Sequence, residues 1–154
     1  MQYGFMKFEI DDSAGYLVNL LARLFARELE ARLKPLGLRI GAFPALLHLW
    51  EREGLTQGEL VKLLDIEQPT LAATLSRMER DGLIKRTKDD TDGRAQRIWL
   101  TETGRSLEKQ AKSAAEEINN LALQSLSATE ASALIISIRS VIADLRQSQE
   151  GTTP

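Results

Sequence analysis

The chain has 154 residues, a formal net charge of −2, a single histidine and no cysteine. That length fits one folded domain, or one domain with a dimerisation extension, and the lack of cysteine excludes disulfides, thiolate nucleophiles, thiol redox sensing and cysteine-ligated zinc. No apolar run approaches the roughly 18 residues of a membrane span and the N-terminus lacks a signal-peptide pattern, so we expect a cytoplasmic protein without a membrane segment.

Three helices are predicted in the first part of the chain. Leucines at steps of three to five residues between 14 and 34 predict a long amphipathic helix, with Ser13 as its N-cap and Pro35 as its stop. The stretch "GAFPALLHLWEREG" predicts a second helix that ends near Gly54, and "TQGELVKLL" predicts a third that begins at Thr56.

A fourth helix is predicted to start with Pro69 at its first position, because a proline suits that position and disfavours helical backbone in Gln68, the residue before it. Leucine and methionine side chains recur on one face of this segment, and Gly82 ends it. The turn that separates it from the third helix is only about four residues long, so the two helices cross steeply.

A β-hairpin and two long helices complete the chain. Residues 84–87 and 96–100 are short alternating segments around a polar loop with an Asp-Gly pair, which predicts a hairpin. After Thr101 the helical pattern returns in "TGRSLEKQAKSAAEEINNLALQSL" and again in "TEASALIISIRSVIADLRQ". The fold class is therefore mainly α with a small β-hairpin.

The third and fourth helices, within residues 55–84, have the arrangement of a helix-turn-helix, whose second helix presents its outward N-terminal half to the DNA major groove. Small or hydrogen-bonding residues on that outward face suit close approach to base edges and phosphates. They are Gln68, Thr70, Ala73, Thr74 and Arg77. A helical hairpin of purely structural role is the alternative, and the basic hairpin that follows disfavours it.

Positive charge is concentrated directly after this candidate recognition helix. Between Arg77 and Arg97 there are seven basic residues against five acidic ones, so the stretch is net +2 in a chain that is net −2. A solvated charged surface would also give such a run, but its position favours contact with nucleic acid.

The stretch "IEQPTLAATLSRMERDGLIKRTKDDTDGRAQRIWLTETG", residues 66–104, resembles the DNA-binding core of the MarR/SlyA family of winged helix-turn-helix transcriptional regulators. The matching elements are "EQPTL", the helix end "MERDGLI", the Asp-Gly-Arg of the wing and the exit "LTETG". The likeness extends over residues 14–147. It implies a winged helix-turn-helix with N- and C-terminal dimerisation helices.

The resemblance also implies roles for individual residues. On the recognition helix the family's positions match Gln68, Pro69, Thr70, Thr74 and Arg77, and on the wing they match Asp92 and Arg94. Lys88 and Arg97, basic residues of the same hairpin, are further expected DNA-binding residues of the wing. Asp92 and Arg94 fit an Asp-x-Arg motif, in which the arginine enters the minor groove and the aspartate holds the wing. Ala73 stands where many relatives carry arginine, so one contact of the family should be missing.

The resemblance implies a homodimer built from the first helix and the last two. An apolar stripe in the last helix supports this independently, although the stripe would also suit packing on the same chain. The stripe consists of Leu134, Ile138, Val141 and Leu145. The expected divisions are an N-terminal segment and dimerisation helix (1–34), the winged helix-turn-helix (35–104), C-terminal dimerisation helices (105–147) and a disordered tail (148–154).

We expect a dimeric, sequence-specific DNA-binding regulator, a repressor released by a small aromatic or phenolic ligand, on a pseudo-palindromic duplex. A winged-helix protein-interaction module is the alternative, motivated by Ala73 and the acidic total charge. A small catalytic domain has no supporting constellation of residues, so no enzyme activity is expected.

Two further features bear on ligand and metal binding. His48 is a half-buried helix residue or a lining residue of a ligand crevice. Asp89, Asp90 and Asp92 resemble part of a calcium loop, but the position that requires a glutamate is Leu100. No metal or cofactor is therefore expected.

Overall fold

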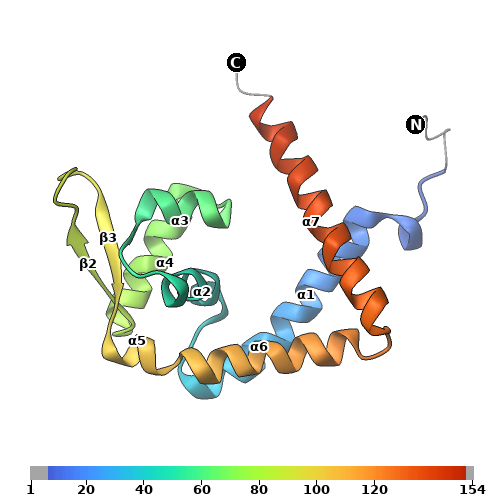
Figure 1. The fold of residues 1–154 in the computed structure, drawn as a ribbon, viewed down its shortest axis with the longest axis horizontal. Helices are drawn as coiled ribbons and strands as arrows, with labels where there is room; N and C mark the ends of the chain where they lie inside the picture. The colour runs from blue at the N-terminus through green and yellow to red at the C-terminus, as the bar shows by residue number, and fades with distance from the viewer. Residues whose placement is uncertain (1–6, 152–154) are drawn as a thin grey trace. The chain divides into compact units, whose positions relative to one another are not determined.

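The computed structural model describes residues 7–151, and helices make up most of them (Figure 1). The helices are α1 (Ala14–Leu33), α2 (Phe43–Glu51), α3 (Gln57–Leu64), α4 (Gln68–Arg80), α5 (Glu102–Ser106), α6 (Glu108–Leu123) and α7 (Ala128–Glu150). Three short 3-10 turns are η1 (Ile10–Asp12), η2 (Lys34–Leu36) and η3 (Ile40–Ala42). The predicted mainly α fold with a β-hairpin wing is confirmed.

The sheet has one strand more than the sequence predicted. Its antiparallel order is β1-β3-β2, with β1 at Leu55–Thr56, β2 at Ile84–Lys88 and β3 at Gln96–Leu100. In the register of the added strand, Leu55 pairs with Ile98. Because β1 runs directly into α3, the wing hairpin is hydrogen-bonded to the start of the helix-turn-helix.

Side-chain caps define several helix starts. Ser13 accepts a hydrogen bond from the Tyr16 amide at 3.3 Å, as predicted for the N-cap of α1. Thr56 and Glu59 form a reciprocal capping box at α3, with bonds of 3.1 and 2.7 Å. Such boxes satisfy amides that have no partner within the helix, so α3 starts at a fixed residue next to the sheet.

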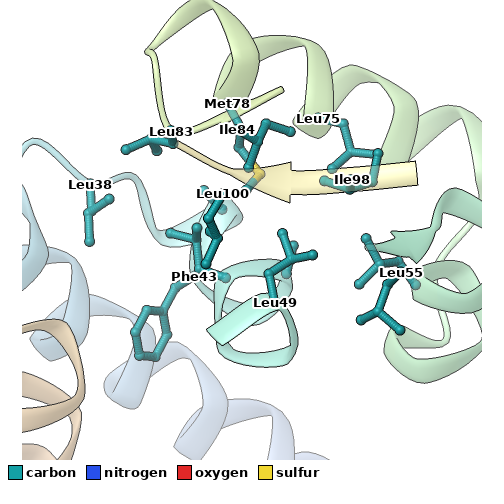
Figure 2. Packing of buried hydrophobic residues seen from close by; sticks show 14 of the residues in the cluster. Leu38, Phe43, Leu49, Leu55, Leu75, Met78, Leu83, Ile84, Ile98 and Leu100 are labelled. Atoms are coloured by element: carbon teal, nitrogen blue, oxygen red, sulfur yellow. The ribbon is translucent and has the colours of Figure 1, made fainter. Parts of the chain in front are cut away.

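The described residues form two compact units, 7–115 and 116–151. The first contains the core, in which α2, α3 and α4 pack against the sheet. Figure 2 shows Leu49 of α2, Leu75 of α4 and Ile98 of β3 gathered in one cluster. All three side chains are fully buried. This packing holds the recognition helix and the wing in one hydrophobic core.

In the second unit, α7 begins with a capping box of Ser127 and Glu130 and contains no buried residue. Ile138, Val141 and Leu145 of the predicted stripe are exposed. Helix α7 continues to Glu150, so residues 148–150 of the predicted disordered tail are helical. Residues 152–154 of that tail, like residues 1–6, lie outside the described part of the chain.

No single helix within residues 7–151 has both the length and the apolar character to cross a membrane. Helices α6 and α7 reach those criteria only when they are counted together as a bent pair.

Candidate nucleic-acid interface

The turn between α3 and α4 is built around a left-handed residue. Asp65 ends α3 with φ of 50°, the one non-glycine residue with positive φ among those described. Glu67 is then extended, and α4 starts at Gln68 with Pro69 in its first turn. The Gln-Pro pair predicted Pro69 as the first helical residue, so α4 begins one residue earlier than expected, and its first turn is exposed.

Five of the six predicted recognition-helix residues are exposed. They are Gln68, Pro69, Thr70, Ala73 and Arg77. Thr74 differs, because its side chain is only 8% exposed and its hydroxyl accepts a hydrogen bond from Arg77 Nη2 at 3.4 Å. Thr74 lies three residues after Leu71 and therefore on the buried stripe of the helix. The sequence placed it on the outward face because it is polar, and its helical position is a better guide.

The tip of the wing is held by Asp92. Its carboxylate accepts a hydrogen bond from the Arg94 amide at 3.0 Å, and its backbone carbonyl accepts one from the Ala95 amide at 3.0 Å. Arg94 itself is exposed, and its guanidinium has no hydrogen bond or ion pair within residues 7–151. The same is true of the Lys88 ammonium group. The geometry is that of a braced loop that carries an unpaired cation.

Arg97, by contrast, is bonded on two sides. Its Nε donates to Asp89 Oδ1 at 3.0 Å, and its Nη1 donates to the carbonyl oxygen of Gly54 at 2.7 Å. The hydrogen bond from Arg97 holds the pKa of Asp89 below its usual value. Asp89, for which the sequence offered no specific partner, is thus the acceptor of the wing's second arginine.

Trp99 packs on the turn that precedes β1. Its indole Nε1 donates to Thr87 Oγ1 across the hairpin at 2.8 Å. The ring covers Gly54, which has φ of 77°, so closely that a Cβ added there would lie 2.8 Å from Trp99 Cη2. The amide of Gly54 also donates to the carbonyl of Ile98 at 2.8 Å. A glycine is required here both for its backbone conformation and for the ring above it.

A second polar network lies at the C-terminal end of β3, around Glu53. Glu53 Oε1 accepts hydrogen bonds from the Leu100 amide and from Arg105 Nη2, and Glu53 Oε2 accepts one from Arg105 Nε, all at 2.9 Å. The bond from Arg105 is the main cause of a pKa of Glu53 below its ordinary value. This carboxylate therefore ties the end of α2 to β3 and to α5.

Arg86 is also used internally. Its Nε and Nη2 donate to the two carboxylate oxygens of Glu79, both at 3.2 Å, so β2 is tied to α4. These bonds lower the pKa of Glu79. Of the basic residues in this region, Arg86 and Arg97 thus serve the fold, while Lys88 and Arg94 remain available to an anionic partner.

An open groove with a volume of about 750 Å³ lies in the first unit. It is lined by Arg27, Glu30, Ala31, Lys34, Leu38, Arg39 and Ile40. His48, the predicted crevice residue, is half-buried on α2 and does not line this groove. Arg39 of the lining also forms an ion pair at 3.6 Å with Asp81, the C-cap residue of α4.

No group of three or more histidine, cysteine, aspartate or glutamate side chains within residues 7–151 is placed to hold a metal ion.

Comparison with known proteins connects this geometry to a family. The model of the MarR family matches residues 36–95, which include α2, α3, α4 and most of the wing. The organic hydroperoxide resistance transcriptional regulator of Bacillus subtilis is 31% identical over 125 residues, which cover 81% of this chain and 85% of that protein.

Solved structures agree over nearly the full length. A MarR transcriptional regulator from Methanosarcina mazei has 26% sequence identity and a TM-score of 0.82, covering 86% of this chain and 96% of that one. A putative MarR family regulator from Listeria monocytogenes, complexed with 26mer DNA, has 23% identity and a TM-score of 0.82, covering 97% and 99%. At that identity the second likeness concerns the fold alone.

Proposed function

The chain belongs to the MarR family of transcriptional regulators, and from that premise we propose that it is a dimeric repressor that binds a pseudo-palindromic DNA duplex and is released by a small ligand. It is not an enzyme, since the matching proteins are regulators of transcription. The protein-interaction module remains the alternative to specific DNA binding.

The exposed, unpaired Arg94 at the tip of a braced wing is the observation that carries the proposal. The Asp92 carboxylate holds the Arg94 amide at 3.0 Å and leaves its guanidinium free. A narrow minor groove focuses negative potential, and a guanidinium stays charged at all physiological pH values. Beside the wing, α4 exposes Gln68 and Thr70 in its first turn, where groups that read base edges in the major groove are expected.

A homodimer is proposed from the apolar residues that remain exposed. On α1 they include Leu17, Val18 and Leu21, and on α7 they include Val141 and Leu145. A second copy of the chain would remove these surfaces from water. In a twofold dimer the recognition helices would lie about 34–36 Å apart, one turn of DNA. The division into a winged helix-turn-helix at 35–104 between dimerisation segments at 1–34 and 105–147 is part of this proposal.

Selection of bound sequences from a random duplex pool, followed by titration of the selected duplex, tests DNA binding. Arg94→Ala should weaken binding by about 1–3 kcal/mol, as for a well-placed arginine contact. Lys109→Ala is the matched control, because Lys109 is exposed and has no ion pair within residues 7–151. Since Lys109 lies in the proposed dimerisation segment, sedimentation must first show that this variant dimerises as the wild type does. If the purified wild-type protein prefers no duplex over random sequence at physiological salt, specific DNA binding is refuted.

The 750 Å³ groove is the proposed effector site. Arg27, Lys34 and Arg39 supply three cations against one anion, Glu30, beside the side chains of Leu38 and Ile40, so the lining is net positive. That lining suits a small aromatic or phenolic anion. Benzoate should bind in calorimetric titration, while its neutral isostere benzamide should not. Equal binding of the two would show that the negative charge of the ligand is not recognised. A role for His48 in a ligand crevice stays a prediction.

The Bacillus subtilis relative is named for organic hydroperoxide resistance. The 154 residues of this chain contain no cysteine, so they offer no thiol that a hydroperoxide could oxidise.

A further inference from the structure

We propose that Arg97 acts in DNA binding as a positioning residue, which fixes the wing against the start of the helix-turn-helix, and that it does not itself contact DNA. The inference rests on the proposed DNA binding. It reassigns a residue that the sequence grouped with Arg94 as a wing contact, although the two arginines have different surroundings in the structure.

The two bonds of Arg97 join the two parts that must be held together. Asp89, at 3.0 Å from Arg97 Nε, is the first residue after β2 and therefore begins the wing loop. Gly54, whose carbonyl lies 2.7 Å from Arg97 Nη1, immediately precedes β1, which leads into α3. One planar guanidinium thus connects the base of the wing to the segment that starts the helix-turn-helix.

Asp89 is itself held in place from several directions. Its amide donates to the carbonyl of Ala95 at 2.9 Å, and its carboxylate accepts the Thr91 hydroxyl at 3.3 Å. Its side chain is 11% exposed, although it lies in a loop whose other aspartates face solvent. Because Ala95 follows Arg94 directly, a shift of Asp89 would displace the residue that carries the minor-groove contact.

The same bonds argue against a phosphate contact by Arg97. The two bonds use two of the five N–H donors of the guanidinium. The Asp89 carboxylate, 3.0 Å from Arg97 Nε, offsets the positive charge of Arg97 and would repel a phosphate brought beside it. Arg94 and Lys88 have no such bonds within the described residues. They can meet DNA without breaking any interaction of the free protein.

Asp89→Asn separates the two roles, because they predict changes of opposite sign. If Arg97 contacted DNA, removal of the Asp89 charge would free the guanidinium and tighten binding. If Arg97 positions the wing, the same change weakens the connection from Asp89 through Arg97 to Gly54 and so weakens DNA binding. Asp90→Asn is the matched control, since Asp90 is adjacent, exposed and without a hydrogen bond or ion pair within residues 7–151. It reports the effect of deleting one negative charge near DNA.

We would measure the dissociation constant of the selected duplex by fluorescence anisotropy at several salt concentrations. Asp89→Asn should bind about three- to fivefold more weakly than Asp90→Asn, the scale of one partly exposed ion pair. Arg97→Gln should weaken binding by a similar factor and leave the salt dependence unchanged. A lost phosphate contact would instead reduce the slope of log K against log salt by about one.

A double-mutant comparison distinguishes positioning from general destabilisation. In an Arg94→Ala background Asp89→Asn should change DNA affinity less than twofold, because the Arg94 contact that Asp89 and Arg97 position is already absent. A loss caused by partial unfolding would be equally large in both backgrounds. Hydrogen exchange of the amides in residues 89–95, measured without DNA, should be faster in Asp89→Asn than in Asp90→Asn.

Failure of the wild-type chain to select any duplex would refute the proposed function before any variant was made. With selection established, the inference alone is overturned if Asp89→Asn binds more tightly than Asp90→Asn. A salt slope reduced by about one in Arg97→Gln would overturn it as well.

Discussion

Replacement of Gly54 by alanine tests how firmly the wing is seated on the turn before β1. Gly54 and Gly82 have nearly the same backbone conformation, with φ of 77° and 75°. A Cβ on Gly82 would meet nothing within 4 Å, whereas one on Gly54 would lie 2.8 to 3.2 Å from three carbons of the Trp99 ring. Gly82→Ala is therefore a control that carries the backbone cost without the steric one.

The expected magnitudes follow from these contacts. A left-handed alanine costs about 1–2 kcal/mol, offset by about 0.4–1 kcal/mol from the restricted unfolded chain, so Gly82→Ala should lose about 1 kcal/mol. Gly54→Ala adds the displacement of a ring that is anchored to Thr87 at 2.8 Å. Overpacking of this kind costs about 1–3 kcal/mol, which gives a total loss of about 2–4 kcal/mol.

Urea unfolding followed by circular dichroism, at one fixed protein concentration because a dimer's stability depends on it, measures both variants. The steric account also predicts that the excess cost of Gly54→Ala disappears in a Trp99→Leu background, where a flexible side chain replaces the ring. If Gly54→Ala and Gly82→Ala lose equal free energy of unfolding, the contact between Gly54 and Trp99 has no energetic role and the reasoning is wrong.

Three other predictions address the second polar network, the core and the dimer. Glu53→Gln should reduce the free energy of unfolding by about 1 kcal/mol at neutral pH. Because Arg105 holds the pKa of Glu53 below its ordinary value, the stabilisation is lost as pH falls through that lowered pKa, so urea midpoints of variant and wild type should converge in acid. Leu75→Ala, at a fully buried position, should cost about 2–5 kcal/mol in the same assay, and a loss below 1 kcal/mol would contradict the burial. Val141→Asp on exposed α7 should shift sedimentation from dimer toward monomer with little loss of helicity, whereas an unchanged dimer would place the interface elsewhere.

The helices could be predicted because their patterns are local. Apolar spacing, the Ser13 cap and the Gln-Pro pair are properties of neighbouring residues. The structure starts α1 as predicted and starts α4 at Gln68, one residue before the predicted Pro69. Strand β1 was missed because two residues are too few to show alternation. It forms because β3 offers Leu55 a hydrogen-bonding edge, which is a tertiary effect.

The candidate site could be predicted in outline but not in its pairings. The charge of Arg97 is visible in the sequence, but its partners are 8 and 43 residues away, at Asp89 and Gly54. Hairpin register would have helped, since Thr87 pairs with Arg97 and places Asp89 on a neighbouring diagonal. The burial of Thr74 could have been predicted from the helical period, because Thr74 falls on the same stripe as the buried Leu71.

If α4 and the wing bind DNA as proposed, the sheet order β1-β3-β2 also limits the operators that the protein can accept. Since β1 leads into α3 and α3 packs on α4, the spacing between the bases under α4 and the groove under the wing is set by the protein. Consider one base pair inserted between the bases that α4 contacts in the major groove and the adjoining stretch of narrow minor groove. The insertion shifts the minor-groove stretch about 3.4 Å along the DNA axis and rotates it about that axis. The protein could then engage one feature but not both, so the length of each half-site should be as strongly selected as its sequence.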